Sequence, residues 1–159
     1  MCGIFGYLAS DGSPLPSEDT LDRMARALRH RGPDDEGFFR EGPVGLGSRR
    51  LSIVDLATGR QPLGNETGAI HLVCNGEIYN AFELRRGLEG RHAFRTHSDT
   101  ETLVHLYEER GLDFLEPVEG MFAVALWDGP RRRLLLARDR AGEKPLFYTV
   151  HRGVLYFAS

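Results

Sequence analysis

The chain opens with an apolar, aromatic run at residues 2–8, which predicts a buried strand. Residues 10–17 follow with the glycine, proline and serine content of a loop. Apolar side chains then recur at helical spacing, and Ser17 stands where an N-cap belongs. We therefore expect a helix that begins after Ser17 and stops near Gly32 and Pro33.

The middle of the chain alternates short apolar runs with helical patterns. Strands are expected over residues 37–40, 44–54 and 69–74. The last of them runs into Asn75-Gly76, a pair typical of a tight turn. A second helix is expected over residues 81–88. A third should begin at Ser98, because Ser98 and Glu101 fit the S-x-x-E capping box.

The last third of the sequence is rich in strand patterns. They cover residues 121–127, 134–138, 146–150 and 154–158. Strands on both sides of a helical middle predict an α+β fold with mostly antiparallel pairing. Because the chain stops at the last of these strands, we expect a piece of a longer protein. Residues 146–157 should then present apolar side chains toward the missing part.

Composition narrows the class of protein. A length of 159 residues with 41% hydrophobic content fits one domain over residues 1–159. The net charge of −3 gives no basic surface for nucleic acid. Two cysteines and no signal-peptide pattern predict a cytoplasmic protein, and the apolar start is too short to cross a membrane. Six histidines without the spacing of metal ligands, and no phosphate-binding glycine motif, predict no metal or nucleotide in this segment.

Cys2 is the first candidate for chemistry. Removal of Met1 would give Cys2 a free α-amine, and such amines have reference pKa values of roughly 7.7–8.0. A nucleophilic thiol and a base would then belong to one residue, as in enzymes that use an N-terminal threonine. The alternative is that Cys2 is simply a small buried strand residue.

Polar residues elsewhere offer groups that acyl transfer requires. The Asn75 amide and the Gly76 N–H could stabilise an oxyanion, although Asn-Gly is also an ordinary turn. Arg50 stands among apolar residues and could bind a carboxylate with two hydrogen bonds. The alternative is that Arg50 is an exposed strand residue. Arg49 would point to the opposite face of the strand. Glu77 and Asp99 could bind an ammonium group. Exposure would equally explain Glu77, and a place in the first turn of a helix would explain Asp99.

Seven motifs in order carry a family resemblance along nearly the whole chain. They are MCGIFGYL, RHRGPDDEG, RRLSIVDL, NGEIYN, HSDTE, GMFAVALWD and ARDRAGEKPLFY. Together they resemble the N-terminal glutaminase domain of glutamine-dependent asparagine synthetases, a class II (type-2) glutamine amidotransferase domain. Ser48 and His97 differ from the residues that are common at these positions in that family, and neither residue has a proposed catalytic role.

The resemblance implies a fold and a reaction. The fold is the N-terminal-nucleophile hydrolase sandwich, four αββα layers with two antiparallel sheets. Cys2 would attack the side-chain amide of L-glutamine to form a thioester and release ammonia, and water would then release glutamate. The free amine of Cys2 would carry the proton, while the Asn75 side chain and the Gly76 N–H would form the oxyanion hole.

The resemblance also implies how the substrate is held and what else takes part. Arg50 would bind the α-carboxylate of glutamine, Glu77 and Asp99 its α-amine, and Ile53 and Val54 would complete the binding site. No cofactor is expected in this domain, because ATP and magnesium belong to a C-terminal synthetase domain that this chain lacks. That domain would receive the ammonia, and a homodimer stays open.

Two other interpretations remain. Phosphoribosyl-pyrophosphate amidotransferase, glucosamine-phosphate synthase and synthetase-like enzymes that modify peptides or sugars carry the same type of glutaminase, so the acceptor of the ammonia is open. The first two of these enzymes usually have HNG where this chain has CNGEIYN. This motif, followed by SDTE, favours the asparagine synthetase type. A non-catalytic homologue acting as a binding module is the other alternative, and Cys2, Arg50 and Asn75 all argue against it.

Overall fold

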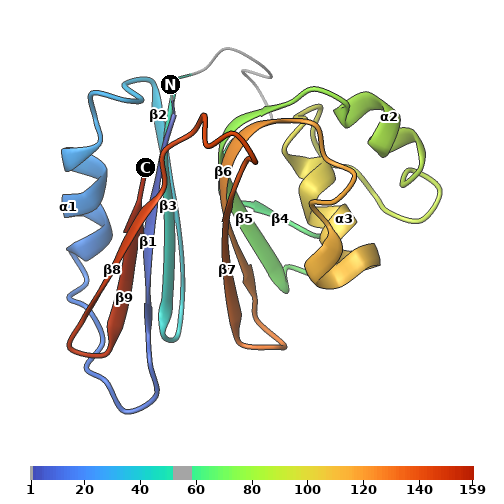
Figure 1. Cartoon of the computed structure of the whole chain (residues 1–159). Coiled ribbons are helices and arrows are strands. Elements are labelled where there is room, and N and C mark those ends of the chain that lie inside the picture. The colour runs from blue at the N-terminus through green and yellow to red at the C-terminus, as the bar shows by residue number, and fades with distance from the viewer. Residues whose placement is uncertain (1, 52–58) are drawn as a thin grey trace.

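A computed structural model describes residues 2–51 and 59–159 of the chain. Within these residues the strands form two antiparallel sheets that face each other (Figure 1). The first sheet has the order β2-β3-β1-β9-β8, and the second has the order β4-β5-β6-β7. The first sheet comprises β1 (Gly3–Ala9), β2 (Asp35–Glu41), β3 (Val44–Arg50), β8 (Phe147–His151) and β9 (Val154–Ala158). The second comprises β4 (Leu63–Gly64), β5 (Ile70–Ile78), β6 (Gly120–Asp128) and β7 (Arg133–Arg138).

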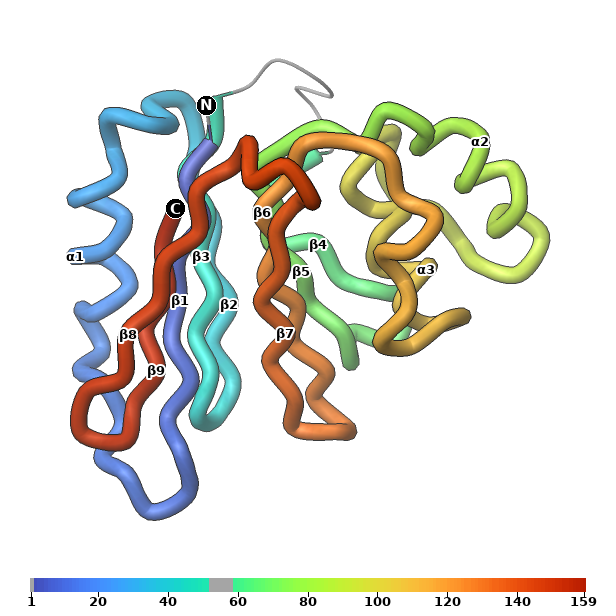
Figure 2. The backbone as a smooth tube through the Cα atoms, viewed as in Figure 1, coloured from blue at the N-terminus to red at the C-terminus, as the bar shows by residue number. Residues whose placement is uncertain are grey.

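Helices cover the outer faces of both sheets. Helix α1 (Thr20–Ala27) lies on the first sheet, and α2 (Ala81–Arg86) and α3 (Glu101–Arg110) lie on the side of the second (Figure 2). A short 3₁₀ helix, η1 (Gly111–Asp113), follows α3 directly. The architecture is therefore the four-layer αββα sandwich that the sequence predicts.

Three apolar clusters fill the spaces between the four layers. The cluster between the two sheets contains Ile4, Val44, Leu46, Val73, Ala123, Ala125, Trp127 and Phe157. A second cluster joins α3 to β5 and β6, and a third joins α1 to β1. Successive strand residues alternate between these clusters, because side chains point to opposite faces of a sheet. On β1, for example, Ile4 faces the other sheet and Phe5 faces α1.

Glycine residues in β3 make room for aromatic side chains of β1. Gly47 lies directly opposite Phe5 in the antiparallel register. A Cβ atom at Gly47 would come within 2.2 Å of the Phe5 ring, so no larger residue fits without a shift. The glycine in this strand thus lets an aromatic ring lie across the neighbouring strand, and α1 packs on the surface that results.

Three local predictions were wrong. Helix α1 has Asp19, not Ser17, as its N-cap, because the Ser17 hydroxyl bonds the Asp19 carboxylate instead, and the helix ends at Ala27, short of Gly32. Asn75 and Gly76 do not form a turn, because β5 continues through them in register with β6. Helix α3 begins at Glu101 rather than Ser98, and no side chain caps it.

The remaining strand and helix predictions agree with the structure to within a few residues. The strand expected over residues 44–54 is observed as far as Arg50, and its last part lies outside the described residues. The short strand β4 and the helix η1 were not predicted. At the C-terminal hairpin the expected apolar exposure is confirmed for β8, where Phe147, Tyr148 and Val150 are 69%, 72% and 63% exposed, but not for β9, where Val154 and Phe157 are buried. No helix in the described residues is long and apolar enough to cross a membrane.

Candidate functional site

The candidate nucleophile stands where the first strand begins. Cys2 directly precedes β1 and lies two residues before Ile4. Because side chains alternate along a strand, Cys2 is on the same face of the first sheet as Ile4, the face toward the second sheet. Its thiol donates to the carbonyl of Leu51 at 3.8 Å, and the Arg31 Nε donates to the carbonyl of Cys2 at 3.3 Å. These contacts fix the start of the chain at the end of the inter-sheet space.

A cavity of about 330 Å³ opens at this point. Its lining brings together the described candidate residues, which come from four separate parts of the sequence: Cys2, Arg50, Asn75, Gly76, Glu77 and Asp99. The other two candidates, Ile53 and Val54, lie outside the described residues. A nucleophile, a cation, an amide and two carboxylates around one space match the groups needed to hold and attack an amino-acid side-chain amide.

Asn75 presents an unused hydrogen-bond donor at the cavity. The residue is only 2% exposed, and its Nδ2 is buried without a hydrogen-bond partner among the described residues. An unpaired buried donor is unfavourable unless an acceptor binds it, so the amide NH₂ is suited to donate a hydrogen bond to a ligand oxygen. The next residue, Gly76, leaves no room for a side chain, because a Cβ atom would come within 2.1 Å of the Met121 carbonyl oxygen. Close packing against β6 therefore requires glycine at this position of the cavity lining.

Two carboxylates and one guanidinium provide opposite charges around this amide. Asp99 precedes α3, and its Oδ2 accepts the backbone N–H of Ile78 at 2.7 Å, so the carboxylate is anchored to β5. Glu77 lies two residues beyond the buried Val73–Asn75 stretch, and it is exposed. Arg50 is the last residue of β3, is half-buried, and lines the same cavity. The charges are arranged to receive a zwitterion.

Several lining residues escaped the sequence analysis. They are Leu51, Gly59, Gln61, Cys74, Ser98, Thr100, Met121 and Lys144. Gln61 has a structural contact, because its Oε1 accepts the backbone N–H of Cys74 at 2.7 Å. Lys144 is the only lysine of the chain. No sequence signal joined it to Cys2, because their meeting depends on the loop between β7 and β8.

The second cysteine of the cavity differs from the first in its chemistry. Burial, with a smaller contribution from the nearby charge of Asp99, raises the pKa of the Cys74 thiol far above its usual range. Cys74 is 2% exposed and stays protonated at neutral pH, so it is a poor nucleophile. The half-buried Cys2 is the thiol of this site that a substrate can reach.

Comparisons with known proteins show the family to which the chain belongs. Residues 1–159 match the sequence family described as "Glutamine amidotransferase domain". The chain is 48% identical over 161 residues to glutamine-hydrolyzing asparagine synthetase 2 of Bacillus subtilis, which covers all of this chain and 21% of that protein. It is 45% identical over 148 residues to the corresponding synthetase of Sandersonia aurantiaca, covering 92% of this chain and 28% of that protein.

Less similar proteins share the domain or its fold. Amidase chry2 of Gibberella zeae is 40% identical over 171 residues, which cover all of this chain and 26% of that protein. The structure of glutamine phosphoribosylpyrophosphate amidotransferase from B. subtilis superimposes with a TM-score of 0.77 at 22% identity, over 99% of this chain and 41% of that one. The chain thus spans about a quarter of the length of these curated relatives, and the solved structure supports the fold.

Proposed function

Because this chain belongs to the glutamine amidotransferase domain family, we propose that it hydrolyses the side-chain amide of L-glutamine, with Cys2 as the nucleophile. The observation that carries the proposal is the shared cavity of Cys2, Arg50, Asn75, Gly76, Glu77 and Asp99. Arg50 binds the α-carboxylate of glutamine, and Glu77 and Asp99 bind its α-ammonium group. Held at both charges, the substrate extends its amide toward Cys2.

The first half of the reaction forms a thioester. Once Met1 is removed, the α-amine of Cys2 takes the thiol proton, and the sulfur attacks the side-chain carbonyl carbon. The oxygen of the tetrahedral intermediate becomes negative and accepts hydrogen bonds from the Asn75 Nδ2 and the Gly76 N–H. When the intermediate collapses, the carbon–nitrogen bond breaks, and the protonated amine of Cys2 delivers its proton to the departing nitrogen, which leaves as ammonia.

The second half returns the enzyme to its starting state. Water gives a proton to the α-amine and attacks the thioester carbonyl, whose oxygen again uses the Asn75 and Gly76 donors. The carbon–sulfur bond then breaks, the sulfur recovers its proton, and glutamate leaves. The overall balance is glutamine plus water to glutamate plus ammonia, and no redox partner is required.

The acceptor of the ammonia is proposed from the relatives. We place it in a synthetase domain that uses ATP, magnesium and aspartate, so that the complete protein makes asparagine. The exposed Phe147, Tyr148 and Val150 of β8 offer this domain a surface to pack against. The free thiols of Cys2 and Cys74 suit a reducing compartment, so we propose a cytoplasmic location.

A mass measurement with a covalent glutamine analogue tests the catalytic proposal. The purified protein is incubated with the diazo-ketone analogue of norleucine, and its intact mass is recorded. We expect the protein without Met1 to gain one adduct on Cys2, and the Cys74→Ala variant to gain the same adduct. A processed, folded protein that gains no adduct would indicate a non-catalytic binding module and overturn the proposal.

A further inference from the structure

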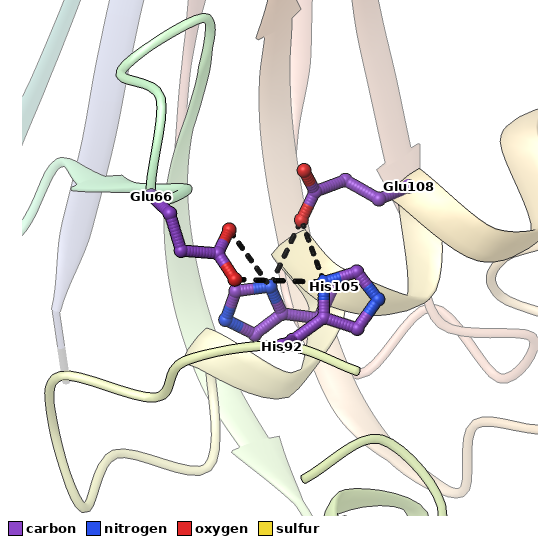
Figure 3. Close-up of side chains that lie close together, drawn as sticks. All are labelled: Glu66, His92, His105 and Glu108. Atoms are coloured by element: carbon purple, nitrogen blue, oxygen red, sulfur yellow. Dashed lines mark hydrogen bonds and ion pairs between the residues drawn. The ribbon is translucent and has the colours of Figure 1, made fainter. Parts of the chain in front are cut away.

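Four side chains with metal-binding groups gather on the helix side of the second sheet, among the described residues. They are Glu66, His92, His105 and Glu108, and one ligand atom from each lies within 4.8 Å of all the others (Figure 3). Glu66 stands between β4 and β5, His92 between α2 and α3, and the other two on α3. None of them lines the cavity that holds Cys2.

The distances among these atoms suit a small tetrahedral ion. The Nδ1 of His92 lies 3.6 Å from Glu66 Oε1 and 3.4 Å from Glu108 Oε2. The Nδ1 of His105 lies 3.8 Å from Glu66 Oε2 and 2.9 Å from Glu108 Oε2. Bonds of about 2.0–2.1 Å to a tetrahedral Zn²⁺ would hold neighbouring ligand atoms about 3.3 Å apart. All four ligand atoms lie within 4.8 Å of one another, so the widest pair would close by up to about 1.5 Å when the ion binds.

Both histidines have a carboxylate behind the ring, as metal-binding histidines usually do. The Nε2 of His92 lies 3.0 Å from Glu109 Oε1, which leaves Nδ1 for the centre of the cluster. The Nε2 of His105 is buried without a hydrogen-bond partner among the described residues, 3.8 Å from Glu101 Oε1. When Nδ1 of His105 binds an ion, the ring proton moves to Nε2, and a small approach of Glu101 Oε1 from 3.8 Å would let it accept a hydrogen bond from that N–H.

The two carboxylates are also held in place. The Asn65 Nδ2 donates to Glu108 Oε1 at 2.7 Å, so Glu108 turns its other oxygen toward the histidines. The Ala93 backbone N–H donates to Glu66 Oε1 at 2.7 Å. The exposed side-chain fractions are 1% for His105, 12% for His92, 21% for Glu108 and 28% for Glu66. A buried histidine therefore forms the base of the cluster, and the carboxylates form a rim that an ion can enter.

Charge balance favours a cation at this place. With neutral histidines, Glu66 and Glu108 bring two negative charges together beside the carboxylates of Glu101 and Glu109. Arg91 brings a positive charge near this group, and its Nη1 lies 3.3 Å from Glu109 Oε2. Two imidazoles with two carboxylates match a borderline ion such as Zn²⁺ better than Ca²⁺ or Mg²⁺, which prefer oxygen ligands throughout.

We propose that Glu66, His92, His105 and Glu108 bind one Zn²⁺-class divalent ion with a structural role. The ion would join the β4–β5 turn, the α2–α3 loop and helix α3, three segments that otherwise meet through side-chain contacts. Glu101, behind His105, also accepts the backbone N–H groups of Arg95 and Thr96 at 2.7 and 2.8 Å. The ion would therefore stabilise the stretch of chain that leads to Asp99.

Metal titration of the purified protein tests this site. The Cys2→Ala variant removes the accessible thiol, and chelator treatment removes bound ions. Zn²⁺ is then titrated in competition with a chromophoric chelator, and Co²⁺ binding is followed by visible absorption. We expect one ion per chain, the intense Co²⁺ bands of a four-coordinate site, no response to Mg²⁺, and a melting temperature that rises with Zn²⁺ concentration.

Variants in the same background separate this site from chance binding. His92→Ala and the conservative Glu108→Gln should weaken Zn²⁺ binding by at least about 100-fold, and Glu109→Gln, behind His92, by about 10–100-fold. His151→Ala is the matched control, since His151 is exposed on β8, and it should leave binding unchanged. Absence of stoichiometric binding, or equal affinity in folded His92→Ala, Glu108→Gln and His151→Ala proteins, would overturn the proposal. Because every readout is made without Cys2, the result is independent of glutamine hydrolysis.

Discussion

Arg49 and Arg50 are neighbours at the end of β3, yet they serve opposite faces of the sheet. Arg49 is 7% exposed and donates from Nε to the carbonyl of Gly32 at 2.8 Å, with its Nη1 paired to Glu36. Arg50 lines the cavity that also contains Cys2. The alternation of side chains along a strand thus assigns two identical residues to two tasks, one structural and one at the proposed glutamine site.

This pair supplies a matched test of substrate binding. Arg50→Ala should raise the KM for glutamine about 10–100-fold, because a charge-assisted pair with the substrate carboxylate is lost, and kcat should change little. Arg49→Ala should leave KM unchanged and lower the free energy of unfolding by about 1–3 kcal/mol, because it leaves the buried Gly32 carbonyl without its donor. Steady-state kinetics and urea unfolding of both variants provide the measurements. An unchanged KM in Arg50→Ala would make Arg50 a structural residue.

Cys2→Ala should abolish glutamine hydrolysis and preserve the fold. The substitution removes the sulfur that forms the thioester, whereas the one hydrogen bond of the half-buried thiol within the described part of the chain is a long one, to the Leu51 carbonyl. Ammonia release measures the activity, and thermal unfolding measures the fold. Hydrolysis at the wild-type rate in this variant would exclude the Cys2 mechanism.

Asn75→Ala should lower kcat by about 10²–10³ through loss of one oxyanion donor. The buried, unpartnered Nδ2 has no structural bond among the described residues to lose. Asn80→Ala is the control, because the Asn80 side chain bonds the Pro117 carbonyl and the Glu119 N–H outside the cavity lining. That variant should lose stability and keep its kcat. A change confined to KM in Asn75→Ala would assign Asn75 to ground-state binding instead.

Apolar runs along the chain predicted most strands and an α+β fold, and the family resemblance implied the four-layer arrangement. The predictions were wrong where strand pairing or a tertiary hydrogen bond overrode the local preference of a residue. Asn75-Gly76 has the composition of a turn, but pairing with Ala123 and Phe122 of β6 holds it extended. Glu101 fits a capping box, but its carboxylate turns instead to the N–H groups of Arg95 and Thr96, so α3 starts later.

The sequence also could not reveal groupings that depend on the tertiary fold. The resemblance identified Cys2, Arg50 and Asn75 through their motifs, and the structure brings them to one cavity. By contrast, His92 and His105 are separated by 13 positions and belong to no metal-binding pattern, since only the packing of the α2–α3 loop on α3 brings them together. Spacing rules detect ligands on one element and miss those that three elements contribute.

Asp139 should make the protein's stability depend on pH in the acid range. The residue is 6% exposed, and its carboxylate accepts the backbone N–H groups of Phe122, Glu143 and Lys144 at 3.2, 2.9 and 3.1 Å. Burial alone would raise the pKa of this carboxyl, but the backbone hydrogen bonds outweigh it and hold the pKa below its usual value. The unfolded chain therefore binds this proton more readily than the folded protein does. The stabilisation is complete above the ordinary aspartate pKa of about 3.9 and is lost as the pH falls through the lower folded value.

Asp139→Asn should accordingly lower the free energy of unfolding by about 1–3 kcal/mol at neutral pH, because an amide NH₂ would face backbone donors. The difference from wild type should shrink below about pH 4, where the wild-type carboxylate is itself becoming protonated. Asp11→Asn is the control, because the Asp11 side chain is 90% exposed, and its effect should stay within about 0.5 kcal/mol. Urea unfolding of the three proteins between neutral and acid pH measures these differences. If the difference in free energy of unfolding between Asp139→Asn and wild type stays constant down to about pH 3, the variant acts through packing rather than through the charge of the carboxylate.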